Sequence, residues 1–198
     1  MTIAEKAQRS HGLLLIMVGP SGVGKSTIAR LLEERTAVWY TVSVTTRLKK
    51  PEDDKGKTYD HIDKSTFFKR LDNDEYLEYA QVYGDYYATP AHPTLDLLAE
   101  GKDVLLEIDV QGALQVVDAF PDAVLIFILP PDQQTLLQRL NDRGRDAPED
   151  IQKRFRAARR EIAMARGSRA FEYMVINDNL ETAVEEIIKI IRLKRGGI

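Results

Sequence analysis

One segment constrains this chain more than any other, the run Gly19-Pro20-Ser21-Gly22-Val23-Gly24-Lys25-Ser26. It follows an unbroken apolar run at 13–18 and precedes a stretch at 27–34 with apolar residues at helical spacing. Strand, glycine loop and helix form the setting in which the G-x-x-x-x-G-K-[ST] pattern binds phosphate. Glycines let backbone N–H groups wrap an anion, which the helix N-terminus also favours. The pattern predicts a nucleotide-binding loop; the alternative is a glycine-rich turn before an ordinary helix.

Two side chains of this loop have specific expected roles. Lys25 is expected to reach the β- and γ-phosphates, and the hydroxyl of Ser26 to hold Mg²⁺. The other residues expected to contact the nucleotide are Gly19, Pro20, Ser21, Gly22, Val23, Gly24 and Thr27.

Composition limits the kind of partner. The chain has 198 residues, enough for one domain with a mobile insert, and a net charge of −3, which argues against general binding of nucleic acid or anionic membranes. It has no cysteine, so a disulfide framework and a cysteine-ligated metal are excluded. No apolar run approaches the roughly 20 residues of a membrane span. The polar segment 1–11 does not resemble a secretory signal. A cytoplasmic location is expected.

The order of the expected elements predicts an α/β fold. From residue 94 onwards, helices at 94–100, 111–120, 132–143, 149–166 and 181–195 alternate with strands at 104–109, 123–129 and 174–176. Such alternation is typical of a parallel sheet covered by helices on both faces. Residues 41–90 differ, because a strand at 38–44, a loop at 45–58, a short helix at 65–71 and a hairpin turning at Gly84-Asp85 indicate a small, mostly β insert.

Ligands bind beyond the carboxyl ends of parallel strands, where the loop at 19–26, Asp109 and Asn177 are all expected to lie. Asp109 ends an apolar strand and could hold Mg²⁺ or contact a substrate. Alternatively, it is a polar strand end that caps the next helix.

Arginines surround a predicted break in the helices at 144–148. They are Arg139, Arg143, Arg145, Arg154, Arg156, Arg159 and Arg160. Two helices joined by a polar hinge could close over a nucleotide, and arginines that arrive on closure stabilise the charge of a transferring phosphoryl group. Arg143 is the best single candidate, whereas a solvated basic helix face accounts for about half of the set.

Seven motifs together resemble the guanylate kinase family. They are the loop at 19–26, V-S-V-T-T-R at 42–47, G-K-T-Y at 56–59, E-Y-A-Q-V-Y-G-D-Y-Y at 78–87, E-I-D-V-Q-G at 107–112, I-L-P-P at 128–131 and V-I-N-D at 175–178. They occur in the family's order and spacing and cover roughly residues 12–195. The combination is highly specific.

The resemblance implies a P-loop kinase fold and ATP-dependent phosphorylation of GMP to GDP with Mg²⁺, which Ser26 and Asp109 would bind. Residues 12–40 and 91–198 would form the kinase core, 41–90 the GMP-binding region and 132–160 the lid. GMP would be bound by Ser43, Arg47, Lys50, Tyr59, Glu78, Tyr87, Thr89 and Asp109. Catalysis would fall on Lys25, Arg47, Arg139, Arg143 and Arg154, and Asn177 would lie near the adenine. GMP and ATP would be the partners of a monomer or homodimer.

Four positions depart from the family pattern. Lys50 replaces a usual arginine and cannot form a bidentate contact. Ala88 replaces glycine, Thr89 replaces serine but keeps the hydroxyl, and Glu107 replaces aspartate. Two other functions compete with the kinase. A catalytically inactive guanylate-kinase-like binding module is disfavoured by the intact Lys25 and Ser26, and a ribose bisphosphate phosphokinase by the combination of Tyr59, Glu78 and Tyr87.

Overall fold

The computed structural model describes residues 11–49, 59–142, 147–167 and 170–196. Contacts divide the chain into two compact units, which are described separately. The first unit comprises the described residues of Met1–Leu14, Ala37–Leu106 and Gln111–Ala123. The second unit comprises Leu15–Thr36, Glu107–Val110 and the described residues of Val124–Ile198. The predicted division into a core, an insert at 41–90 and a lid stays a prediction.

The second unit is built on parallel strands. Strand β8 (Val124–Leu129) pairs in parallel with β1 (Leu14–Val18) and with β9 (Tyr173–Ile176). Every residue of β1 and β8 is buried. Continuous apolar runs of this kind are typical of parallel strands covered on both faces, because neither face meets water.

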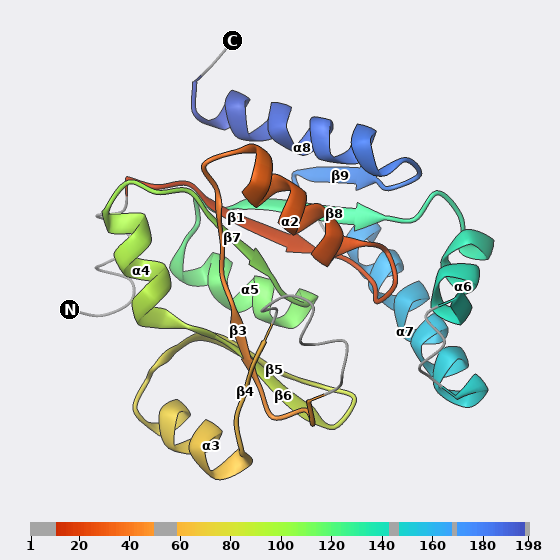
Figure 1. The fold of residues 1–198 in the computed structure, drawn as a ribbon, viewed down its shortest axis with the longest axis horizontal. Coiled ribbons are helices and arrows are strands. Elements are labelled where there is room, and N and C mark those ends of the chain that lie inside the picture. The colour runs from red at the N-terminus through yellow and green to blue at the C-terminus, as the bar shows by residue number, and fades with distance from the viewer. Residues whose placement is uncertain (1–10, 50–58, 143–146, 168–169, 197–198) are drawn as a thin grey trace. The chain divides into compact units, whose positions relative to one another are not determined.

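Four helices belong to the second unit, namely α2 (Lys25–Arg35), α6 (Gln133–Asp142), α7 (Pro148–Gly167) and α8 (Leu180–Lys194). Figure 1 shows α8 running alongside β9 and α2, and it packs against both. Asp132 precedes α6 and accepts a hydrogen bond from the Thr135 amide at 2.7 Å, so it caps the N-terminus of this helix. Leu136 and Leu140 of α6 pack against Ile151 and Ala158 of α7.

The first unit contains a four-stranded sheet in the order β4-β3-β6-β5. Its strands are β3 (Ser43–Thr45), β4 (Tyr59–His61), β5 (Tyr76–Val82) and β6 (Asp85–Pro90). Strands β3 and β4 are parallel, and the other pairs are antiparallel. Phe67 of α3 (Lys64–Asp72) packs onto Val44, Tyr76 and Ala88 of this sheet. The unit also holds α4 (Ala91–Ala99), β2 (Trp39–Tyr40), and most of β7 (Val104–Glu107), which pairs in parallel with β2, and of α5 (Val110–Ala119).

The expected single strand at 38–44 is wrong. Two short strands, β2 and β3, replace it, and they belong to different sheets. The amide of Thr41 still donates to the carbonyl of Leu105 in β7, whereas Val44 already pairs with Ala88 of β6. A run rich in β-branched and aromatic residues indicates extended backbone but does not show that the chain changes its partner strand midway.

The hairpin between β5 and β6 is present, with its turn one residue earlier than expected. The turn residues Tyr83 and Gly84 have φ angles of 53° and 92°. Positive φ at both central residues defines the type I′ turn, whose twist matches that of the flanking strands.

The α/β class with parallel sheet structure is confirmed by these elements. Among the described residues, no helix is both long enough and apolar enough to cross a membrane.

Candidate active site

The loop that follows β1 has a backbone conformation that glycine alone adopts easily. Gly19 and Gly24 have φ angles of 153° and 99°. A Cβ atom on Gly19 would lie 2.6 Å from the carbonyl oxygen of Ile128, and one on Gly24 would lie 2.5 Å from Nδ2 of Asn177. The loop is therefore packed too closely for a side chain at these two positions, and its shape depends on both glycines.

Lys25 is the first residue of α2 and folds back over this loop. Its Nζ donates to the carbonyl oxygens of Gly19 at 2.6 Å and Pro20 at 3.3 Å. Gly24 precedes the helix and accepts from the amides of Thr27 and Ile28. The ammonium group and the positive end of the helix thus lie at the same glycine loop, which favours binding of an anion there.

The hydroxyl of Ser26 donates to Oε1 of Glu107 at 3.0 Å. Glu107 is the last residue of β7, two residues before Asp109. From the sequence, Glu107 is only a departure from the family pattern, and Asp109 is the predicted partner of Ser26 at the metal. The sequence signal that could have identified Glu107 is its two-residue spacing from Asp109, because residues two apart on a strand point to the same face.

Glu161 of α7 is a second acidic residue that sequence analysis missed. Burial raises the pKa of its carboxyl group, the nearby Lys25 lowers this pKa, and Asp109 raises it. Glu161 therefore lies within the electrostatic influence of the loop lysine and of Asp109. The charged residues nearest to it in the sequence are arginines, so the helix pattern alone gave no reason to select it.

Replacing Glu161 by glutamine is expected to flatten the pH dependence of stability. A carboxyl group whose pKa is raised by folding stabilises the protein below its unfolded value, 4.5, and this contribution is lost as the pH rises through the folded value. The unfolding free energy of the wild type should thus fall, relative to that of Glu161→Gln, as the pH rises above 4.5. Urea denaturation at several pH values measures it, and parallel profiles for the two proteins would contradict the assignment.

A depression beside α2 is lined by residues of the glycine loop, α2, α6 and the segment after β9. Its lining residues are Gly24, Thr27, Arg139, Asn177, Asp178 and Leu180. The buried side chain of Asn177 donates from Nδ2 to the Val23 carbonyl at 2.7 Å. Arg139 donates to the Asn177 carbonyl at 2.9 Å. Asn177 thus ties the segment after β9 to the glycine loop.

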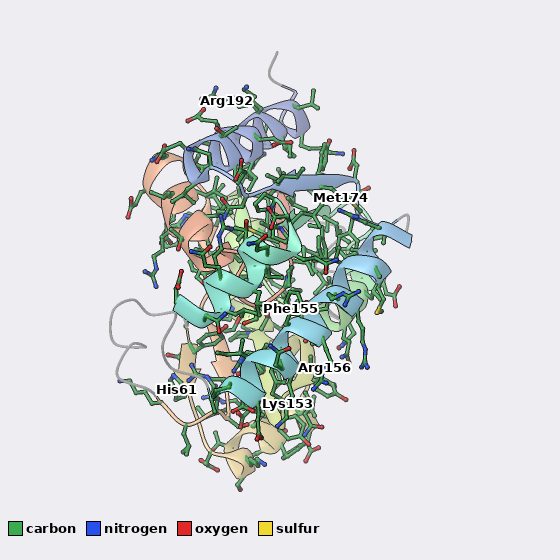
Figure 2. The ribbon with its side chains drawn as sticks, turned by 90° about the vertical axis from the view of Figure 1, so that its right-hand side faces the viewer. His61, Lys153, Phe155, Arg156, Met174 and Arg192 are labelled. Carbon is green, nitrogen blue, oxygen red and sulfur yellow. The ribbon has the colours of Figure 1, made fainter. Side chains whose placement is uncertain are left out.

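The predicted lid arginines differ in their positions. Arg154 of α7 makes a long contact, 3.5 Å, with the hydroxyl of Ser21 in the glycine loop. Lys153 and Arg156, its neighbours on α7, are exposed and extend from the helix, while Phe155 packs against the α6–α7 cluster (Figure 2). Arg143 lies outside the described residues. Arg154 is only partly exposed, whereas Lys153 and Arg156 are exposed, so Arg154 does not belong to the solvated face of α7.

A buried carboxylate lies in the sheet of the first unit. Glu78 of β5 is 5% exposed, and its Oε1 accepts a hydrogen bond of 2.6 Å from the hydroxyl of the fully buried Thr89. Glu78 and Thr89 face each other across β5 and β6, and Ser43 pairs with Tyr59 across β3 and β4. Extending the β3–β6 register by one residue places Ser43 opposite Thr89. One row across the sheet therefore contains four of the predicted substrate residues.

Arg47, Tyr59 and Tyr87 form an adjoining group. The rings of Tyr59 and Tyr87 meet edge to face at 5.6 Å, and the guanidinium of Arg47 lies 5.8 Å from the centre of the Tyr59 ring. Burial raises the pKa of Tyr87, and the positive charge of Arg47 opposes this shift. The group combines a cation with phenol hydroxyls that can donate to an anion. Lys50, predicted to act with it, lies outside the described residues.

Comparison with known proteins decides the family. The family model described as guanylate kinase matches residues 11–194. The chain belongs to the guanylate kinase family. The predicted resemblance is thereby confirmed.

Individual relatives agree with this assignment. The guanylate kinase of Thermus thermophilus is 47% identical over 185 residues, which cover 93% of this chain and 83% of the relative. That of Carboxydothermus hydrogenoformans is 45% identical over 177 residues, covering 89% and 85%. The crystal structure of guanylate kinase from Anaplasma phagocytophilum superimposes with a TM-score of 0.77 at 31% identity, covering 93% of this chain and 87% of that one. A gluconokinase from Sinorhizobium meliloti, with a TM-score of 0.52 and 14% identity, shares the fold.

Proposed function

We propose that this member of the guanylate kinase family transfers the γ-phosphate of ATP to GMP, giving ADP and GDP. The observation that carries the substrate assignment is the buried carboxylate of Glu78, held by Thr89 at 2.6 Å. Guanine presents N1–H and its 2-amino group as adjacent donors, and a carboxylate accepts from both. A buried carboxylate facing the bare acceptor N1 of adenine would cost free energy, so this site favours a base that supplies donors.

ATP is proposed to bind at the second unit. The glycine loop and Lys25 would hold its phosphates, and the depression lined by Thr27 and Asn177 would take the adenine. Mg²⁺ prefers oxygen ligands, and the Ser26 hydroxyl and Glu107 carboxylate, 3.0 Å apart, meet this preference. Asp109 remains a further candidate. When bound, Mg²⁺ neutralises charge on the β- and γ-phosphate oxygens.

The phosphate of GMP is proposed to bind to Arg47, Tyr59 and Tyr87. Arg47 offers a planar guanidinium with several donors, a geometry suited to phosphate oxygens. Its backbone is fixed on both sides, since its amide donates to Thr45 Oγ1 at 3.1 Å and its carbonyl lies 2.7 Å from Nδ1 of His61. Lys50 is proposed as an additional point charge for the same phosphate.

Positioning and electrostatics account for most of the catalysis in phosphoryl transfer. Lys25, Arg139, Arg143 and Arg154 are proposed to stabilise the negative charge on the transferring group. Arg154 already contacts the glycine loop through Ser21, and Arg139 is anchored to the Asn177 carbonyl. The sequence prediction of a cytoplasmic protein that acts as a monomer or homodimer is retained as part of this proposal.

Phosphorus NMR of a mixture of the protein, ATP, Mg²⁺ and GMP tests the reaction directly. GDP and ADP should appear in equal amounts, and chelation of the metal with EDTA should stop both. A protein that binds GMP but forms no GDP would instead be the inactive binding module. Loss of ATP without a matching gain of GDP would mean that another acceptor, or water, receives the phosphate.

A further inference from the structure

Glu78 lies at an irregularity in strand β5. The register between β5 and β6 shifts between Tyr76 and Glu78, and three successive residues, Tyr76, Leu77 and Glu78, are buried. A regular strand would alternate, as Tyr79, exposed, and Ala80, buried, do immediately afterwards. Such irregularities re-aim side chains beside active sites. The direction of the Glu78 carboxylate is therefore set locally and needs support from neighbouring elements.

Gly112, in the first turns of α5, supplies one such support. Its backbone is not in the left-handed region, so alanine would suit its conformation. A Cβ atom at this position would nevertheless lie 2.8 Å from Cδ and 3.3 Å from Cγ of Glu78, with Oε2 nearer still. The carboxylate cannot simply turn away, because Thr89 holds its other oxygen at 2.6 Å. Gly112 thus provides the space in which the Glu78 carboxylate lies.

Gln115, three residues later on α5, supplies a second support. Its side-chain amide accepts from the Tyr79 amide at 3.3 Å and donates to the Tyr79 carbonyl at 2.8 Å. Strand β5 is the edge of its sheet, so this side chain takes the place that a neighbouring strand would occupy. Residues three apart on a helix lie on the same side, so Gly112 and Gln115 contact adjacent residues of β5.

We propose that Gly112 and Gln115 are positioning residues that fix the Glu78 carboxylate for guanine recognition. The inference rests on the proposed function, in which Glu78 reads N1–H and the 2-amino group. Gly112 sets how closely α5 approaches the carboxylate, and Gln115 fixes the strand at the next residue. Neither residue needs to touch GMP to influence its binding.

Gly112→Ala is expected to raise KM for GMP and to lower kcat/KM for GMP by roughly 10- to 100-fold, because a displacement of about 1 Å is enough for a hundredfold loss. KM for ATP should stay within about twofold, and the preference for GMP over AMP should fall. Gly167→Ala is the matched control. Gly167 also lies in a helix, but a Cβ atom there would meet nothing within 4 Å, so this variant should behave as the wild type.

A double-mutant cycle with Glu78→Asp tests whether the effect passes through Glu78. The shorter side chain withdraws the carboxylate from the space of the added methyl group. Adding Gly112→Ala to Glu78→Asp should therefore change kcat/KM for GMP and Tm little, although Gly112→Ala alone lowers both. Independent losses that simply add would overturn the proposal, as would failure of the double variant to fold while Glu78→Asp folds.

Gln115→Glu keeps the size of the side chain but places a carboxylate against the Tyr79 carbonyl. It should raise KM for GMP several-fold with little change in KM for ATP. Gln134→Glu, the same change at an exposed position of α6, is the control. Equal effects on both substrates would contradict a positioning role. A wild type that forms no GDP would refute the proposed function, whereas the Tm values of the double-mutant cycle would still test the contact between Gly112 and Glu78.

Discussion

Lys25→Ala is expected to lower kcat at least about a hundredfold while the protein stays folded, by analogy with the removal of one preorganised donor from an active site. Lys25 Nζ lies 2.6 Å from the Gly19 carbonyl, directly over the glycine loop where the phosphates are proposed to bind. The lost charge would otherwise stabilise the transferring phosphoryl group. Initial rates of ADP and GDP formation at saturating ATP and GMP give the measurement.

A second variant separates the charge of Lys25 from its shape, and a third serves as a control. Lys25→Met keeps most of the length of the side chain without the ammonium group and should lose nearly as much turnover as the alanine variant. Lys189→Ala removes an exposed lysine from α8 and should leave turnover unchanged. Circular dichroism and Tm establish that each variant is folded. Near-normal turnover of folded Lys25→Ala would rule out the proposed role of the glycine loop.

Glu78→Gln is expected to lower kcat/KM for GMP by roughly 10- to 100-fold, because a hydrogen bond to a charged group contributes about 1.5–3 kcal/mol. The amide keeps the size of the carboxylate but offers one acceptor and an unwanted donor. That donor can pair with N1 of adenine, so kcat/KM for AMP should fall less or rise. The ratio of the two values should therefore decrease, while KM for ATP stays nearly constant.

Glu75→Gln is a suitable control for this change. Glu75 lies three residues earlier in the chain, with its side chain 44% exposed and 3.9 Å from Arg70. The substitution has the same chemistry but lies in a solvated ion pair, which contributes little. An unchanged GMP-to-AMP ratio in Glu78→Gln would mean that guanine is recognised by other residues.

The glycine loop and its flanking elements could be predicted from sequence because their signals are local. The apolar run before Gly19, the glycine spacing and the helical pattern after Ser26 all describe one continuous segment. The structure agrees, with β1 ending at Val18 and α2 beginning at Lys25.

Features that depend on distant parts of the chain could not be predicted in this way. The pairing of Ser26 with Glu107 joins residues 81 apart, and that of Gln115 with Tyr79 joins residues 36 apart. The split of the expected strand at 38–44 depends on two different partner strands. Periodicity reports which face of an element is buried, but it does not report what covers that face.

The most direct test of the account is a comparison of kcat/KM for GMP, AMP and ribose 1,5-bisphosphate with the wild-type protein, ATP and Mg²⁺. A site built to hydrogen-bond its substrate can reject an analogue that lacks those groups by roughly 10⁴-fold. We predict a preference of this order for GMP over AMP and no measurable turnover of the sugar phosphate. Comparable values for GMP and AMP, or a preference for ribose 1,5-bisphosphate, would contradict guanine recognition by the buried carboxylate of Glu78.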